Sequence, residues 1–134
     1  MLDYKSTTPL YMQIANWLET EILKGNFSVD EKVYSQYKLA EVFQINPATA
    51  ARGLALLTEE GILYDRRGLG KFVTKEAVQI IREKRKRTIL QQSVATLIKE
   101  AIYLQIDEDS LVDIIRNAYR KQKEGQDDSL SKRK

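Results

Sequence analysis

The sequence predicts a mostly α-helical protein, in which a winged helix-turn-helix domain precedes a C-terminal helical dimerisation region. Three observations predict this fold class. Apolar residues recur at helical spacing in three successive segments between residues 9 and 60. The pattern then changes to short alternating runs around a Gly-Leu-Gly turn. Residues 75–106 contain neither glycine nor proline, which favours long helices. We therefore expect domains at 1–74 and 75–123, followed by a disordered tail at 124–134.

The first two helices are predicted from an apolar stripe and a capping residue. After Pro9, one stripe at helical spacing is formed by Leu10, Ile14, Leu18 and Ile22. Ser35 is a favourable N-cap for a short second helix over residues 36–43, because its hydroxyl can accept a hydrogen bond from a free backbone N–H group.

The third helix is predicted to begin at an Asn-Pro pair and to end before the glycine at position 61. Asn46 can cap the free N–H groups, and Pro47 occupies the first helical position, where no N–H is needed. A rotation of 100° per residue places an apolar set on the buried side, namely Ala50, Gly53, Leu54 and Leu57. The opposite side presents Ala48 and Arg52, with Thr49 on its flank.

This exposed face suits the reading of a DNA duplex. In helix-turn-helix units, the N-terminal part of the third helix enters the major groove. Small residues there let the helix approach the base edges. Arg52 can bond guanine or a phosphate, and Thr49 can bond a phosphate or touch a thymine methyl group.

A hairpin follows the third helix. Residues 62–65 and 71–73 are predicted strands, and residues 66–70 join them. Gly68 and Gly70 allow positive φ angles in the turn. Arg66, Arg67 and Lys71 give this wing a cationic character suited to phosphates or the minor groove.

The C-terminal part is predicted to be helical, with 75–106 forming one helix or two nearly in line. The basic run at 82–87 is interpreted as a solvated helix face in preference to a second DNA-binding patch. A seam with four-three spacing is either intramolecular core or a dimer interface, and its length favours dimerisation; it comprises Leu90, Val94, Leu97, Ala101 and Leu104. A last helix is expected from Leu111 to about Lys123.

Composition argues against an enzyme and limits the electrostatic argument. The chain has no His and no Cys, which removes the commonest general base and thiolate ligands, so we expect no metal and no cofactor. No apolar run is long enough for a membrane span, and the N-terminus lacks the layout of a signal peptide, so we expect a cytoplasmic protein with no membrane partner.

Residues 1–74 contain eight Lys and Arg against nine Asp and Glu. Nucleic-acid binding must therefore depend on where the cations point.

Five motifs in order resemble one known family. They are P-L-Y-x-Q-I-A at 9–15, S-x-x-x-L-A at 35–40, N-P-x-T-x-x-R at 46–52, E-x-G-I-L at 59–63 and G-x-G-x-F-V at 68–73. Together they resemble the N-terminal domain of the GntR family of bacterial transcription regulators. The Asn-Pro pair and the short C-terminal region are similar to its YtrA-like subfamily. The resemblance covers residues 9–74 strongly.

The resemblance implies a homodimer that binds double-stranded operator DNA and mostly represses, often at neighbouring transporter genes; whether a small-molecule effector exists stays open. The family's contacts fall at Ser35, Thr49, Arg52 and the wing from Gly68 to Lys71. Tyr37 replaces the family's usual Arg, and the neighbouring Lys38 is a possible substitute. The full set of candidate DNA-binding residues is Ser35, Gln36, Lys38, Asn46, Ala48, Thr49, Arg52, Arg66, Arg67, Gly68, Gly70 and Lys71.

A second interpretation is a protein-interaction module without sequence-specific DNA binding. Winged helices also act as scaffolds in assemblies, and residues 1–74 are not net positive. In that case the C-terminal helices would bind a different partner chain. The two interpretations differ in the expected salt dependence of DNA binding.

Overall fold

The structure is a computed structural model that describes residues 2–132, with side chains described for residues 2–127. It divides into two compact units, residues 1–87 and 88–134. The first contains α1 (Leu10–Leu23), α2 (Gln36–Phe43), α3 (Pro47–Glu59), β1 (Leu63–Arg66), β2 (Gly70–Val73) and α4 (Ala77–Arg85). A π-helical turn at Lys86–Leu90 follows α4, and the second unit contains α5 (Gln91–Tyr103) and α6 (Glu108–Lys132).

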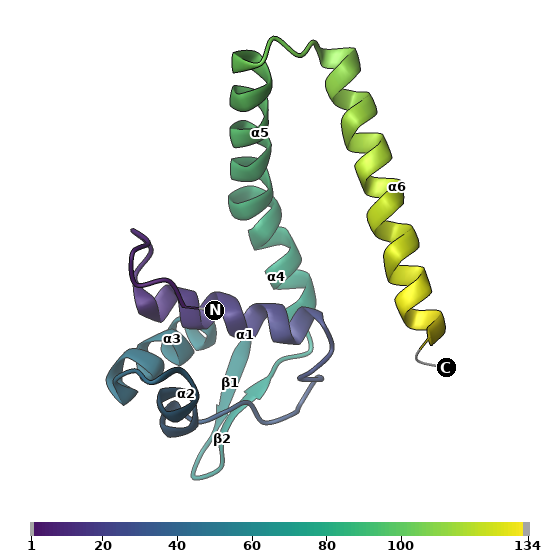
Figure 1. Cartoon of the computed structure of the whole chain (residues 1–134). Coiled ribbons are helices and arrows are strands. Elements are labelled where there is room, and N and C mark those ends of the chain that lie inside the picture. Colours follow the sequence, from purple (N-terminus) through teal and green to yellow (C-terminus); the bar gives the residue numbers. More distant parts are fainter. Residues whose placement is uncertain (1, 133–134) are drawn as a thin grey trace. The chain divides into compact units, whose positions relative to one another are not determined.

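The first unit has the predicted winged helix-turn-helix architecture. Figure 1 shows α2 and α3 grouped near α1, with the β1–β2 hairpin projecting beside them. α3 packs against both α1 and α2. Their shared core contains fully buried side chains from every helix of the unit, including Ile14, Leu18, Leu39, Leu57 and Ile81. The three helices and the hairpin expected from the sequence are therefore confirmed.

The caps of α2 and α3 form as expected. The Ser35 hydroxyl oxygen accepts a hydrogen bond from the Lys38 N–H at 3.1 Å, and the Asn46 side-chain oxygen accepts one from the Ala48 N–H at 2.8 Å. Gln44 closes α2 in the left-handed conformation, with φ of 55°. These caps fix the tight turn between α2 and α3.

α1 and α3 cross at very short range. Gly53 is buried in α3, and a Cβ atom at this position would lie 2.8 Å from the Tyr11 carbonyl oxygen. It would also lie 3.2 Å from the side chain of Ile14, which is fully buried. The absence of a side chain at Gly53 therefore permits this crossing and explains a residue that the helix by itself would disfavour.

The wing is an antiparallel pair with a short third segment alongside it. Leu63 pairs with Val73, and Arg66 pairs with Gly70. The Val33 N–H donates to the Lys71 carbonyl at 3.0 Å, and the Asp30 N–H donates to the Val73 carbonyl at 2.8 Å. Residues 30–33 therefore cover the outer edge of β2 and fix the base of the wing to the domain.

The first domain extends beyond the predicted boundary at residue 74. Ala77 and Ile81 of α4 are both completely buried in the domain core. α4 thus belongs to the first compact unit, which continues to residue 87. This extension changes the charge of the unit to fourteen Lys and Arg against eleven Asp and Glu, a formal net charge of +3.

An ion-pair cluster fastens α4 to the domain, contrary to the interpretation of residues 82–87 as an entirely solvated face. Glu19 of α1 is fully buried and accepts hydrogen bonds from Lys84 and from Arg85 Nε. The Lys84 ammonium also bonds both carboxylate oxygens of Glu60, at 2.9 and 3.0 Å. Burial by itself lowers the pKa of Lys84, but its hydrogen bonds to Glu19 and Glu60 and their negative charges outweigh that effect, so its pKa is raised above the usual 10.5.

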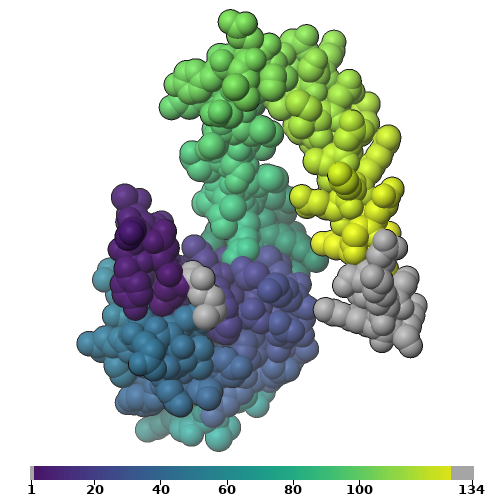
Figure 2. Space-filling model, in the orientation of Figure 1, coloured from purple at the N-terminus to yellow at the C-terminus, as the bar shows by residue number. Residues whose placement is uncertain are grey.

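The second unit has almost no interior. Among residues 88–127, Ala101 is the only buried residue. α5 and α6 make few contacts with each other, and their side chains project outward in the space-filling view (green to yellow in Figure 2). Asp107 caps α6 by accepting a hydrogen bond from the Ser110 N–H at 2.8 Å, which lowers the pKa of its carboxyl group.

The predicted disordered tail is wrong over residues 124–132, because α6 continues to Lys132. The polar composition of this segment predicts exposure to solvent, and an exposed helix satisfies that pattern equally well. A single glycine at position 125 disfavours a helix by only about 1 kcal/mol and does not end it. Residues 133 and 134, which also belong to the predicted tail, lie outside the described residues.

Candidate nucleic-acid interface

The two faces of α3 are confirmed as predicted. Its buried residues are Ala50, Gly53, Leu54 and Leu57. At its N-terminal end, Ala48 and Arg52 are exposed and Thr49 is partly exposed. The capping role of Asn46 orients this first turn, because its side-chain oxygen is engaged with the Ala48 N–H. The turn thus presents small side chains, one hydroxyl group and one guanidinium group to solvent.

Arg52 rests on an aromatic ring. Its guanidinium carbon lies 3.9 Å from the centroid of the Tyr11 ring of α1. Within residues 2–127, Arg52 has no carboxylate partner, which argues against the simple alternative that it serves as a structural ion pair. Its N–H groups therefore keep their capacity to donate hydrogen bonds to a ligand.

The start of α2 contributes a polar patch near Ser35. The Ser35 hydroxyl accepts the capping hydrogen bond, which leaves its own O–H group able to donate. Gln36 is half-buried, whereas Tyr37 and Lys38 are exposed. The tyrosine that replaces the family's usual arginine is thus available at the surface, as is the neighbouring lysine.

The three predicted wing cations differ in their surroundings. The Lys71 ammonium bonds Asp65 at 2.8 Å and the Thr58 hydroxyl at 3.0 Å, so it is engaged within the domain. Arg66 donates to the Tyr64 hydroxyl at 2.9 Å and lies over the Phe72 ring. In contrast, Arg67 has no partner among the described residues and is exposed in the turn.

The turn conformation depends on the two predicted glycines. Gly68 and Gly70 have φ angles of 76° and 118°, in the region that favours glycine. Gly70 has a second role, because a Cβ atom there would lie 2.9 Å from Cε of Lys32. The Lys32 side chain therefore passes directly over Gly70.

Lys32 is a candidate that the sequence does not reveal, since it lies in a segment without clear periodicity. It helps to line a groove of about 220 Å³ between the start of α2 and strand β2. Ser35, Gln36, Gly70 and Lys71 line the same groove. The structure thus brings the α2 and wing candidates together and adds an exposed cation between them.

Comparison with known proteins identifies the family. No protein-family model matches the chain. YtrA, an HTH-type transcriptional repressor of Bacillus subtilis (strain 168), is 30% identical over 115 residues, which cover 86% of this chain and 88% of YtrA. A GntR family transcriptional regulator from Listeria monocytogenes superposes with a TM-score of 0.68 at 28% identity, over 85% of this chain and 98% of that one.

The chain belongs to the GntR family. This assignment confirms the predicted resemblance, including its YtrA-like character, and places the chain among transcription regulators rather than enzymes. The match to YisV, an uncharacterized HTH-type regulator of B. subtilis, is 35% identical over 77 residues but spans only 16% of that longer protein. AraR(DBD) in complex with operator ORX1 superposes with a TM-score of 0.51 at 25% identity, over 55% of this chain and 92% of that one.

Over residues 2–132, no helix is long and apolar enough to cross a membrane. In the same part of the chain, no group of three or more His, Cys, Asp or Glu side chains is arranged to hold a metal ion.

Proposed function

We propose that this GntR-family chain is a homodimeric regulator that binds specific operator DNA and represses transcription. The observation that supports this most is the exposed surface of the first two turns of α3, where Thr49 and Arg52 have, among residues 2–127, no side-chain partner on another helix except the Tyr11 ring. AraR(DBD) is described in complex with an operator, and YtrA is described as a repressor, which supports the same activity here.

The proposed contacts fall into two groups. The first two turns of α3 enter the major groove, where Arg52 donates to guanine or to a phosphate and Thr49 contacts the DNA backbone or a thymine methyl group. The start of α2 and the wing flank these turns. From there, the Ser35 hydroxyl, Lys32 and Arg67 are able to reach phosphates on either side.

A random-sequence selection followed by a binding titration tests this activity. Enrichment of one duplex sequence supports specific binding, and affinity for random DNA should fall steeply as salt rises, because phosphate contacts release counterions. The absence of binding at low salt would instead favour the protein-interaction module. Arg52→Ala should weaken operator binding by roughly 1–3 kcal/mol. Arg82→Ala, which removes an exposed arginine of α4, is the matched control.

The second unit supports dimerisation because its apolar side chains are uncovered. Leu90, Val94, Leu97 and Leu104 of the predicted seam are between 40% and 61% exposed, and only Ala101 is buried. A helical pair with so little interior has insufficient buried apolar surface to be stable in water by itself. A second copy of the same unit supplies a matching apolar surface in a closed two-fold pair.

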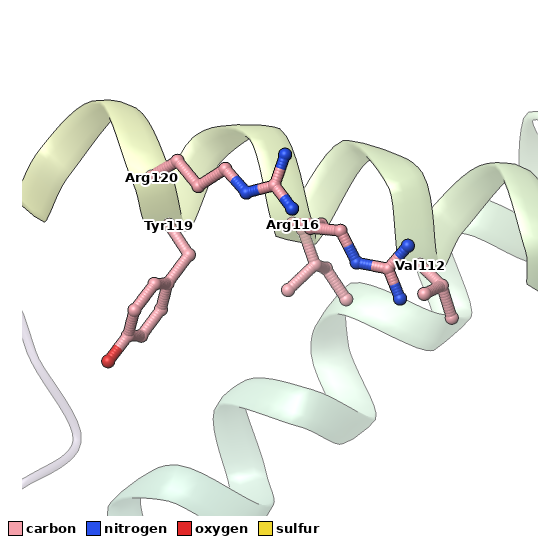
Figure 3. Close-up of a pocket in the computed structure, with 5 residues that line it drawn as sticks. Val112, Arg116, Tyr119 and Arg120 are labelled. Carbon is pink, nitrogen blue, oxygen red and sulfur yellow. The ribbon is translucent and has the colours of Figure 1, made fainter.

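α6 adds a further uncovered surface to this unit. An apolar groove of about 330 Å³ runs along it, lined by Val112, Ile115, Arg116, Tyr119 and Arg120. Figure 3 shows the Tyr119 ring and the two arginine side chains along the same helix. We assign this groove to the same dimer interface, because it continues the exposed apolar surface of the unit.

Sedimentation of two matched variants tests the dimer. Leu97→Asp places a charge in the seam and should convert the protein to monomers with much weaker operator binding. Gln92→Asp adds the same charge to α5 outside the seam and should leave a dimer. A two-fold symmetric consensus in the selected DNA would support the same conclusion. A stable Leu97→Asp dimer would refute the proposed seam.

The regulated genes form the last part of the proposal. The YtrA-like character suggests that the operator lies beside transporter genes. Mapping the positions bound in the genome, together with transcript levels after deletion of the gene, tests this point. A rise in the neighbouring transcripts would support repression, and a fall would indicate activation.

A further inference from the structure

The contact between Arg52 and Tyr11 joins the proposed reading helix to α1. Tyr11 is half-buried, and Arg52 Cζ lies over its ring, 3.9 Å from the ring centroid. No carboxylate within residues 2–127 pairs with Arg52. Among the residues whose side chains are described, the guanidinium group of Arg52 therefore has a cation–π contact with this ring and no ion pair.

The backbone of Tyr11 is held where α1 packs on the domain core. Tyr11 lies where α1 crosses α3, and its carbonyl oxygen approaches the site of the missing Gly53 side chain. Ile14, one turn further along α1, is completely buried against the same glycine. Because both helices are held at this crossing, the backbone from which the ring projects toward Arg52 is held in place.

An arginine that lies over an aromatic ring keeps different N–H groups available for a ligand than an arginine in a salt bridge does. A carboxylate partner would occupy the N–H donors at the edge of the guanidinium plane. An aromatic ring instead covers the face of that plane and leaves the edge donors free. The stack also limits the number of conformations of a long side chain before DNA binds, so less conformational entropy is lost in the complex.

We propose that Tyr11 is a positioning residue for DNA recognition, whose ring holds the Arg52 guanidinium group so that its edge donors meet a base pair. This inference rests on the proposed DNA-binding function. It assigns to the tyrosine of the P-L-Y segment a role in specificity, although Tyr11 lies outside the helix-turn-helix and the wing.

The test compares two variants on the operator obtained by selection and on random duplex DNA, using the full-length protein. Tyr11→Leu removes the ring and should weaken operator binding about 3- to 10-fold, while binding to random DNA changes less than 2-fold. Tyr11→Phe keeps the ring and should retain operator binding within 2-fold. Tyr4→Leu makes the same change at an exposed tyrosine without a ring contact and should have no effect.

A double-mutant cycle separates positioning from a general loss of stability. In an Arg52→Ala background, Tyr11→Leu should cause no further loss, because the guanidinium group that the ring holds is already absent. A repeated selection with Tyr11→Leu should also show weaker preference at the same base pair that Arg52→Ala affects. Thermal unfolding of each variant, measured beside the binding, identifies any loss that follows from partial unfolding.

Three results would overturn the inference. The first is an equal loss in Tyr11→Phe and Tyr11→Leu, which would assign the effect to the hydroxyl group. The second is a full additional loss from Tyr11→Leu in the Arg52→Ala background. The third is an unchanged base preference in Tyr11→Leu while Arg52→Ala changes it. These results are distinguishable from a failure of the proposed DNA-binding function, because in that case the wild-type protein itself would select no DNA sequence.

Discussion

Replacing Glu19 with glutamine tests whether α4 is held to the DNA-binding domain by a buried charge. Glu19 has no exposed side-chain surface, and it bonds both Lys84 and Arg85. Glu19→Gln keeps the volume of the side chain and removes its charge. Removing one partner of a buried ion pair typically destabilises a protein by about 3–5 kcal/mol, because the remaining charge stays buried without compensation.

The structure places the expected loss below that range. Lys84 keeps its two bonds to Glu60, and Arg85 keeps bonds to the Asn16 carbonyl at 2.7 Å and the Thr20 hydroxyl at 2.9 Å. Both cationic side chains are also 21% exposed, so water partly compensates for the lost charge. We therefore expect a loss of about 2–3 kcal/mol. For a domain of this size, that corresponds to a fall in Tm of roughly 10–20 °C.

Circular dichroism during thermal and urea unfolding measures this loss of stability, at one fixed protein concentration because the proposed dimerisation would make the transition depend on concentration. Glu83→Gln is the matched control, since Glu83 is exposed and its contacts are local: an ion pair with Lys86 at 3.5 Å and a hydrogen bond accepted from Gln79 at 3.3 Å. The control should change stability by less than about 0.5 kcal/mol. If Glu19→Gln is as stable as this control, the buried cluster does not stabilise the docking of α4.

Three further predictions concern single residues. Because the pKa of Lys84 is raised on folding, its protonated ammonium group stabilises the folded state fully below the unfolded pKa of about 10.5, and this stabilisation is lost as the pH rises through the folded pKa. The free energy of unfolding of the wild type should therefore fall relative to that of Lys84→Met when unfolding is measured above that pH. Gly53→Ala gains about 1 kcal/mol of helix propensity but places a methyl group against the Tyr11 backbone, where overpacking costs about 1–3 kcal/mol. The variant should therefore unfold at a lower urea concentration than the wild type. A more stable variant would show that the crossing of α1 and α3 relaxes. Asn46→Ala should lower stability by about 1 kcal/mol and weaken operator binding, and an unchanged Cm would exclude a capping role.

Local sequence patterns predicted the fold of the first domain because each element carries its own signal. The Asn-Pro pair located the start of α3, and its apolar repeat located the buried face down to Gly53. The helical spacing cannot show what the glycine touches, because Tyr11 lies on a different helix. The same limit applies to the candidate site, where the sequence treats Arg67 and Lys71 alike although only Lys71 is engaged with Asp65.

Long-range pairing explains the main error in the domain boundary. α4 is short and mostly charged, so its composition resembles a solvated linker. Its attachment depends on Glu19, which lies 65 residues from Lys84 in the sequence. A buried glutamate within an apolar stripe is a possible signal for such a pairing, but it does not identify the partner. The continuation of α6 was missed for a different reason, since polarity does not distinguish an exposed helix from a coil.

Because residues 88–127 have almost no buried interior, the stability of this part of the regulator should depend on protein concentration. If two chains pair through these helices as proposed, mass action favours separated subunits at low protein concentration, and their uncovered helices then open readily and become accessible to proteases. At high concentration, pairing would cover the apolar side chains of both helical units. The level of occupied operator would then rise more steeply than the amount of protein, without any effector molecule.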